Sequence, residues 1–501
     1  MNNLRPGTPL APFVGILCGL ALAVYLGSLI GGSEVGELIG IALVALGVAS
    51  LVLIRDYWWA PLVLISALTF RTNVLGFIMT GIDVGVVVLA MILPLNLAMR
   101  RLHPAEPPLK VGLAFKLLFA FVVVHAAVII LYNRYQGVPL KNIVKAYYTA
   151  LAPLAFYALL FRYCKPHTVK PVTFWTFVMY AFVLAVSIPV IWMGTFIPFL
   201  NSAHFLFDWT HSGVAIGAAR SYAPLLFAAT LALFPVMRSA PGKLLVFLGV
   251  LLSIVGALVS ASRIAILVCI VEGLIMCMLR RRFWVIAPIA ALVLLLGFYI
   301  TNDPGVLYNL PEPVHRALTP FNVSSQQTAV QAAAEGSNEW HEDLQRDSFV
   351  YWTSDLWAFL VGHGFKAWDE SLTGDPAFTQ YYEDAKRLAV QMGRPENALN
   401  SITNIFGLAG LVLYAALLIR LFRQTLSARR MHSARSFERG LCDFSITTLL
   451  AFVFFAPWAG AIPAINLIYF QLGLLAAGRL QKQHADGAVE RRAAEMVPQL
   501  T

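Results

Sequence analysis

The stretch that decides the fold reads RDSFVYWTSDLWAFLVGHGFKAW at 346–368 and, after a polar interval, GRPENALNSITNIFGLAGLVLYAALLIRL at 393–421. Its first part belongs to a polar insertion of about 97 residues, 302–398, between two apolar segments. Connections longer than roughly 15 residues that lack structure of their own are usually functional or disordered. We therefore expect the chemistry of this chain at the place where a partly helical insertion returns to the apolar chain.

The composition indicates a polytopic membrane protein. Of 501 residues 59% are hydrophobic and only 12% are charged, which is unlike a large soluble domain. Apolar runs of roughly 17 to 23 residues predict transmembrane helices. They lie near 12–30, 35–54, 57–75, 82–98, 111–131, 144–161, 172–194, 221–238, 243–260, 264–280, 283–301, 399–421, 441–459 and 461–478. The fold class expected is therefore an all-α membrane bundle of about 12–14 helices.

These segments predict a domain organisation along the chain. Residues 1–301 hold the first eleven helices, 302–398 form the loop domain, 399–479 hold the last three helices, and 480–501 form a tail. With the N-terminus inside, the cytoplasmic segments hold 23 of the 36 Lys and Arg, including a basic loop at 420–440. Both termini are then cytoplasmic and the large loop is periplasmic or extracellular. This bias accounts for the net charge of +10 without a nucleic-acid partner.

Two arginines fall at the predicted outer ends of helices, beside the loop. Arg220 occurs in GAARSYAPLLF and Arg263 in VSASRIAILV. A guanidinium near hydrocarbon costs on the order of 3 kcal/mol on insertion scales unless it reaches the interface or is paired. Each is compatible with a simple interfacial arginine. Two of them on the side of the one large loop favour an anion site, because guanidinium groups bind phosphate with two hydrogen bonds.

The predicted outer loop before the sixth span adds three more basic residues: Arg134, Lys141 and Lys145. Such an outward cluster at membrane level is suited to a lipid-linked pyrophosphate with its headgroup in the outer leaflet. The alternative for Lys141 and Lys145 is ordinary contact with anionic membrane lipids.

Four sequence fragments occur in a fixed order around the loop. Ser260 to Arg263 reads SxSR at a helix start, Arg346 and Trp352 lie in the loop, and GHG follows at 362–364. A polar pair then opens NxLxxxxxxxGLxGLxL at Asn397 to Leu413. This order resembles the O-antigen ligase and O-antigen or exopolysaccharide polymerase superfamily of bacterial envelope glycosyltransferases. The resemblance covers roughly 215–425.

The resemblance implies a GT-C-like membrane glycosyltransferase of the bacterial inner membrane that works on the periplasmic face. It implies an undecaprenyl-pyrophosphate-linked glycan as donor, a glycan acceptor, and neither metal nor other cofactor. Arg263, Arg220 and Arg346 then match the arginines that hold the pyrophosphate, and other envelope polysaccharide-assembly proteins are further candidate partners. No metal-ligand spacing occurs among the Cys and His residues of this chain.

The sequence departs from the resemblance at the polar pair. Ligases of the family carry His-Asn where this chain has Glu396 and Asn397. Glutamate also accepts a proton, so Glu396 is the candidate general base, although a carboxylate there is equally suited to cap the helix. His363 and His341 are rival bases. His363, Asn397 and Trp352 are further candidates for substrate binding. The aromatic residues of the loop offer flat faces of the kind on which sugars stack. Some of these aromatic residues are expected only to pack the loop.

Three classes of function remain open at this point: a glycosyltransferase, a transporter and a scaffold. The replacement of histidine favours a polymerase of lipid-linked repeats over a ligase that transfers a finished glycan to lipid A core or protein. A lipid-glycan flippase or transporter also explains the helices and the basic outer residues, but it does not explain the aromatic loop. A non-catalytic assembly scaffold is the third reading.

Overall fold

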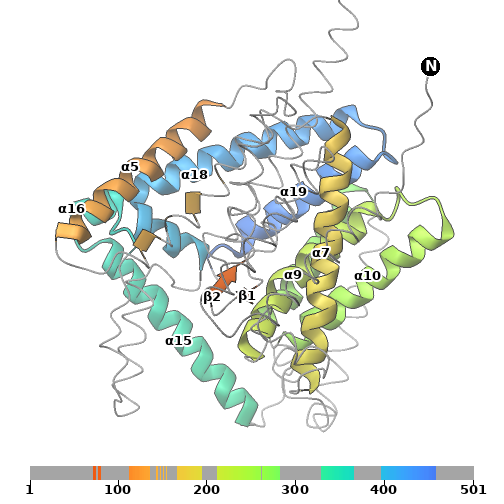
Figure 1. The fold of residues 1–501 in the computed structure, drawn as a ribbon, viewed down its shortest axis with the longest axis horizontal. Coiled ribbons are helices and arrows are strands. Elements are labelled where there is room, and N and C mark those ends of the chain that lie inside the picture. Colours follow the sequence, from red (N-terminus) through yellow and green to blue (C-terminus); the bar gives the residue numbers. More distant parts are fainter. Residues whose placement is uncertain are drawn as a thin grey trace, which may run out of the picture. The chain divides into compact units, whose positions relative to one another are not determined.

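The structure is a computed structural model that describes twelve parts of the chain: 71–74, 77–80, 112–135, 143–144, 147, 150–151, 154, 166–193, 212–260, 262–281, 329–365 and 397–457. Apart from one short hairpin, the regular elements in these ranges are helices (Figure 1). This confirms an α-helical membrane protein.

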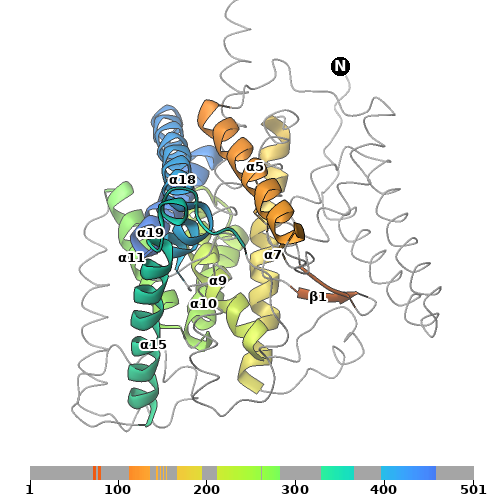
Figure 2. The same ribbon diagram turned by 90° about the vertical axis from the view of Figure 1, so that its left-hand side faces the viewer.

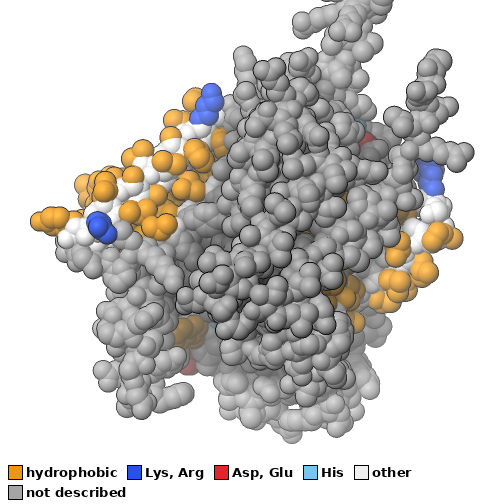
Figure 3. All heavy atoms as spheres, viewed as in Figure 1, with side chains coloured by type: hydrophobic (Ala, Val, Ile, Leu, Met, Phe, Trp, Pro, Cys, Tyr) orange, Lys and Arg blue, Asp and Glu red, His pale blue; other side chains and the backbone are white. Residues whose placement is uncertain are grey.

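Five helices within the described residues are long and apolar enough to cross a membrane. They are α5 (Leu113–Tyr135), α7 (Pro166–Met193), α9 (Ser212–Leu233), α10 (Ala240–Val259) and α18 (Ala398–Met431). Each overlaps a span predicted from hydropathy. Hydrophobic side chains cover the exposed face of α5, with basic side chains at its ends, as expected for a helix in lipid (Figure 3). The predicted spans at 12–54, 82–98, 283–301 and 461–478 lie outside the described residues.

The remaining helices include two inside the polar insertion. α11 (Arg263–Leu279) and α19 (Phe437–Phe455) match predicted spans, whereas α15 (Ala329–Trp352) and α16 (Leu356–Val361) lie within 302–398. The expectation that the insertion is partly helical is therefore confirmed.

One prediction about secondary structure is wrong. Residues 71–74, near the end of the span expected at 57–75, are not helical, because β1 (Arg71–Val74) pairs antiparallel with β2 (Phe77–Thr80). Arg71 pairs with Thr80 in this register. A charged residue and a two-residue connection containing Gly76 favour a hairpin over a continued apolar helix.

The chain divides into two compact units. One consists of Met1–Pro108, Arg162–Tyr222 and Leu480–Thr501, and the other of Leu109–Phe161 and Ala223–Arg479. In the first unit, α7 and the beginning of α9 are joined by Tyr180 and Tyr222, which are both buried with ring centroids 5.2 Å apart. The described part of the insertion belongs to the second unit. It is grouped there with α5, α10, α11, α18 and α19 rather than alone.

In the second unit a tight turn joins α10 to α11. Ser260 ends α10 and donates its hydroxyl to the carbonyl of Ala257, while Ser262 caps α11 by accepting from the backbone N–H of Ala265. Both serines are buried. The two serines of the SxSR fragment therefore serve the turn, because they bind helix-end groups that have no intrahelical partner. Arg263 is the first residue of α11.

The helix α18 is broken at Gly407, whose φ and ψ are 60° and −165°. The GHG turn of the insertion, 362–364, fills this break: the backbone N–H of His363 donates to the carbonyl of Asn404 at 2.8 Å, and that of Gly364 to the carbonyl of Ile405 at 3.0 Å. A break removes carbonyls from the helical hydrogen-bond ladder, and lipid offers them no replacement. The turn supplies the missing donors.

Glycine is required on both sides of this contact. A Cβ on Gly362 would lie 2.4 Å from the carbonyl oxygen of Ile405, and one on Gly407 would lie 2.5 Å from the backbone nitrogen of Val361. Gly362 and Gly407 both have positive φ, which side chains on L-residues disfavour. The two backbones therefore touch at their glycines.

A cluster of aromatic rings surrounds Phe406, the residue before the break. Phe406 is fully buried and its ring lies 5.3 Å from His125, 6.2 Å from Phe365 and 6.4 Å from Tyr147. His125 belongs to α5, and its Nδ1 is hydrogen-bonded to the hydroxyl of Tyr147 at 2.9 Å. Edge-to-face ring pairs add about 0.5–1.5 kcal/mol each beyond burial. This Phe406 cluster fixes the end of the insertion to α5 and α18.

We predict that Gly407→Ala and Gly362→Ala lower the free energy of unfolding by at least about 1–3 kcal/mol each, from the positive φ alone. The clash with the facing backbone adds to this. Thermal unfolding of the purified protein measures it. The control is Gly217→Ala in α9, where a Cβ meets nothing within 4 Å and stability should rise by up to about 1 kcal/mol. If Gly362→Ala unfolds at the same temperature as the wild type, the stabilising role of the interlocked turn is contradicted.

Candidate functional site

The start of α18 lies at the end of α19. The backbone N–H groups of Ala398 and Leu399 donate to the carbonyl of Ala456 at 3.1 and 3.2 Å. Asn397, which is buried, caps the helix by accepting from the N–H of Asn400 at 2.7 Å. Three N–H groups at this helix end are thus already bonded within the protein. Asn397 therefore has a capping role, whatever else it contacts.

The loop helix α15 contacts the same place. Gln345 donates its side-chain amide to the carbonyl of Pro457 at 3.3 Å, directly after the carbonyl that caps α18. Leu344 and Ser348, one turn apart, are the buried residues of this part of α15. The C-terminal part of α15 therefore packs on the bundle, while its N-terminal part extends away from α18 (Figure 2).

The directions in which α11 and α19 run place Arg263 at this end of the second unit. Arg280, directly after α11, binds Asp443 near the start of α19, and the two helices contact each other. They therefore run antiparallel, so the beginning of α11 lies toward the end of α19, where Ala456 caps α18. At 1.5 Å per residue the 17 residues of α11 span about 25 Å. The Arg263 side chain is half-buried there.

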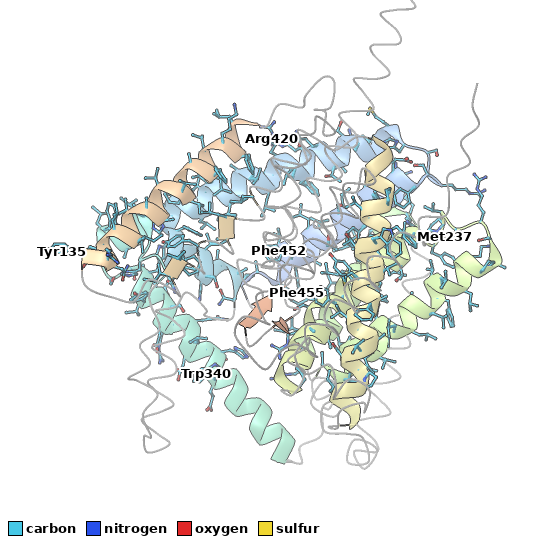
Figure 4. All side chains as sticks on the ribbon, in the orientation of Figure 1. Tyr135, Met237, Trp340, Arg420, Phe452 and Phe455 are labelled. Atoms are coloured by element: carbon cyan, nitrogen blue, oxygen red, sulfur yellow. The ribbon has the colours of Figure 1, made fainter. Side chains whose placement is uncertain are left out.

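The GHG turn adjoins the end of α5 that carries Arg134. A Cβ on Gly364 would lie 2.6 Å from Ile129 Cγ1 and 2.7 Å from the hydroxyl of Tyr147. Arg134 is exposed in the last turn of α5, five residues beyond Ile129. Figure 4 shows Tyr135, the next residue, at the α16 end of α5, with Arg420 at the other end. Arg134, Arg263, Asn397 and the GHG turn thus belong to one end of this unit.

His363 has a well-defined hydrogen-bond arrangement. Its Nε2 lies 2.9 Å from the carbonyl of Tyr351 and 3.3 Å from the hydroxyl of Ser354. A carbonyl only accepts, so Nε2 carries the proton that is donated to it. The ring stacks on that of Tyr351 with centroids 3.9 Å apart. His363 is therefore held with Nε2 as the donor, so Nδ1 is the ring nitrogen to consider as a base.

Asp355 adds a negative charge beside this histidine. It is the N-cap of α16, and the backbone N–H of Ala358, 2.7 Å from Oδ1, is the main cause of a pKa below the usual value for aspartate. Asp355 therefore remains ionised. Burial, and then the charge of Asp355, raises the pKa of the Tyr351 phenol above its ordinary value. The phenol therefore stays neutral, and its ring face is what contacts His363.

Two predicted loop residues have structural partners. Arg346 is 70% exposed and pairs with Asp343 at 2.9 Å and with Asp347 at 3.8 Å, both on its own helix. Trp352 donates Nε1–H to the carbonyl of Phe359 at 3.0 Å and stacks on the ring of that residue. Arg346 is therefore already neutralised locally, and Trp352 fixes α16 against α15.

The other predicted site residues are placed as follows. Arg220 is exposed on α9 in the first unit. Glu396, Lys141 and Lys145 lie outside the described residues. Each remains a prediction for the site.

The aromatic residues of the loop divide into two groups. Tyr351, Trp352 and Phe365 pack within the protein, whereas the side chains of Phe349 and Trp357 are 58% and 59% exposed. The exposed pair offers flat apolar faces next to α16.

Sequence reasoning missed three residues at this end: Gln345, Asp355 and Asn404. Asp355 had a visible signal, since Ser-Asp before an apolar run is a helix-start pattern. Asn404 is buried, and its side-chain amide has no hydrogen-bond partner among the described residues. A buried unsatisfied amide beside a helix break is unusual and points to a polar function or to a bound water. No pattern in the sequence NSITNIFG, residues 400–407, distinguishes Asn404 from its neighbours.

Within the described ranges, no group of three or more His, Cys, Asp or Glu side chains is arranged to hold a metal ion. No protein-family model matches the chain, and no curated protein matches it in sequence.

We predict that Trp352→Phe loosens the junction of α15 and α16. The substitution keeps a ring on Phe359 but removes the hydrogen bond to its carbonyl, which contributes about 0.5–1.5 kcal/mol. Hydrogen exchange of residues 352–365 should accelerate accordingly. Trp357→Phe is the matched control, because that side chain is largely exposed, and it should leave the exchange unchanged. Equal exchange in the two variants would contradict the assigned role.

Proposed function

We propose that this protein is a membrane glycosyltransferase that uses a lipid-pyrophosphate-linked glycan as donor and a sugar hydroxyl as acceptor, and polymerises envelope polysaccharide repeats. The observation that carries the proposal is the insertion of the GHG turn into the break of α18. It fixes the ring of His363 through Nε2, with Nδ1 as the candidate base, at the end of the second unit where Arg134 and Arg263 lie. The resemblance to envelope glycan polymerases and ligases agrees with this arrangement.

The reaction needs two kinds of group. The acceptor oxygen forms a bond to the anomeric carbon, the bond from that carbon to the pyrophosphate oxygen breaks, and the hydroxyl proton passes to a base. Negative charge grows on the leaving oxygen, which preorganised guanidinium groups stabilise. The pyrophosphate leaves on its lipid carrier, and in-line displacement inverts the anomeric centre.

Arg263 is the chief candidate for the pyrophosphate. It is half-buried, where a charge interacts more strongly than in water, and the serine-capped turn fixes its backbone. Arg220, Lys141 and Lys145 are further candidates. Arg346 would have to exchange Asp343 and Asp347 for the phosphate, so its contribution is smaller.

His363 is the base that the geometry supports, with Glu396 as the alternative. A general base must reach the proton it abstracts, and it contributes about 10²–10⁴-fold to the rate. The exposed rings of Phe349 and Trp357, close to His363 in the chain, are suited to stack on sugar rings.

Two other functions compete. A ligase that transfers the glycan to lipid A core or protein would use the same chemistry with another acceptor. A lipid-glycan flippase is favoured by one observation, the broken helix α18, since interrupted helices with buried polar groups form many transport sites. Reconstituted protein supplied with lipid-pyrophosphate oligosaccharide separates them. Chain growth supports the polymerase, glycan on another acceptor the ligase, and movement without a new glycosidic bond the flippase.

We predict that Arg263→Gln lowers glycan transfer in this assay by about 10²–10³-fold, the usual effect of removing one transition-state donor. Arg263→Lys should restore part of the rate, because it keeps the charge but not the two-pronged geometry. Lys243→Gln is the matched control, since it removes a positive charge from the opposite end of the same α10–α11 pair. Full activity of folded Arg263→Gln would overturn the role of this arginine.

We predict that His363→Gln lowers the rate of transfer by about 10²–10⁴-fold while donor binding persists. Glutamine still donates to the carbonyl of Tyr351 but has no basic nitrogen. His341→Gln on α15 should leave the rate unchanged. If His363→Gln is active and Glu396→Gln is not, the base is Glu396.

A further inference from the structure

A second charged centre lies at the opposite end of the second unit, away from the insertion. The side chain of Asp443 on α19 is 3% exposed and is shared by three arginines. Its Oδ1 lies 2.6 Å from Arg429 Nε and 3.7 Å from Arg439 Nε, and its Oδ2 lies 3.3 Å from Arg280 Nε. The three arginine side chains are only 14–20% exposed. One buried carboxylate thus serves three half-buried cations.

The same arginines bind the ends of the neighbouring helices. Arg280 donates to the carbonyl of Ala232 on α9 at 2.7 Å, Arg429 to that of Leu279 at the end of α11, and Arg439 to that of Arg429. These contacts place the ends of α9, α11 and α18 and the start of α19 side by side. The guanidinium groups are held in fixed positions as a result.

Three guanidinium groups pair with Asp443, so their charges exceed that of this one carboxylate. Burial, and then the charge of Arg429, lowers the pKa of Arg439 below the ordinary value for arginine, so repulsion between the two guanidinium groups persists. Two exposed arginines adjoin them, Arg281 after α11 and Arg430 at the end of α18. Half-buried cations in excess are costly unless an anion neutralises them.

Arg281, directly after Arg280, has an unusual backbone conformation. Its φ is 54°, in the left-handed region, at a helix end where glycine is the usual residue. Among the described residues it is the one residue other than glycine with a positive φ. Glycine would fit this position with less strain, so the charge of Arg281 can be removed here without a loss of stability.

Apolar side chains are exposed beside these charges. Met278 on α11 and Met431 on α18 are 59% and 53% exposed, and each lies within three residues of an exposed arginine. Guanidinium groups bordered by apolar surface at the end of membrane helices are suited to a ligand with a phosphate and hydrocarbon chains. A soluble anion would use only the first of these features.

We propose that Arg280, Arg429 and Arg439, which share Asp443, form a binding site for the phosphate headgroup of an acidic phospholipid together with Arg281 and Arg430, their neighbours in the chain. The headgroup phosphate supplies the negative charge that Asp443 alone does not. The lipid then holds together the ends of α11, α18 and α19. This site is independent of the proposed catalytic end.

The test measures thermal unfolding of the full-length protein in phosphatidylcholine nanodiscs with and without phosphatidylglycerol. Phosphatidylglycerol should raise the unfolding temperature of the wild type by about 2–4 °C. Arg281→Gly is the sharpest variant, because glycine fits the left-handed backbone and the fold in phosphatidylcholine should be as stable as the wild type or more so. Its response to phosphatidylglycerol should fall by at least half, and Arg430→Gln should behave likewise.

The matched control is Arg238→Gln, which removes an exposed positive charge between α9 and α10, outside the proposed site. It should keep the full response to phosphatidylglycerol. An equal loss in Arg238→Gln would mean general attraction to a negative surface and would overturn the site. So would equal unfolding temperatures of the wild type in the two nanodiscs, or an equal rise with inorganic phosphate in phosphatidylcholine alone.

Discussion

The contact between the backbones at Gly362 and Gly407 is the constraint on which the rest of the second unit depends. A helix that breaks among apolar neighbours leaves carbonyls without donors, and each such group costs several kcal/mol in hydrocarbon. Here the carbonyls of Asn404 and Ile405 receive donors from the GHG turn of a segment about 40 residues earlier in the chain. The insertion is therefore part of the bundle, since it completes a transmembrane helix that cannot complete itself.

The two ends of the second unit differ in how their charged groups are used. At the end that holds the insertion, N–H groups at the start of α18 are bonded to Ala456 and Asn397, and Arg346 is paired with its own helix. Among the described residues, the proposed pyrophosphate chemistry at this end then rests on Arg263 and Arg134 rather than on Arg346. At the other end three arginines share Asp443, so their charges exceed that of this one carboxylate.

Hydropathy predicted the membrane helices well, because about 20 apolar residues in succession have few alternatives to a spanning helix. The span expected at 111–131 is α5 at Leu113–Tyr135, and that at 243–260 is α10 at Ala240–Val259. The Glu396-Asn397 pair also correctly marked the start of α18, where Asn397 is the cap.

The sequence alone did not predict interactions between segments that are distant in the chain. The fragment NIFGLAG at 404–410 reads as continuous helix, because the break at Gly407 depends on a turn that approaches from 362–364. The three arginines around Asp443 come from separate parts of the chain, which no local pattern joins. By contrast, the pairing of Arg346 with Asp343 follows helical spacing and was open to prediction once the loop was expected to be partly helical.

The interlocked turn also bears on the choice between an enzyme and a flippase. Transport by alternating access requires one group of helices to move against another around the bound substrate. Such a movement between α18 and the insertion would separate two backbone hydrogen bonds and the rings around Phe406, with no water in the hydrocarbon to replace the lost donors. Glycosyl transfer makes the opposite demand, because a base and a cation must keep fixed positions around the reacting atoms. A rigid junction that holds His363 in one tautomer meets that demand, and this favours chemistry over translocation.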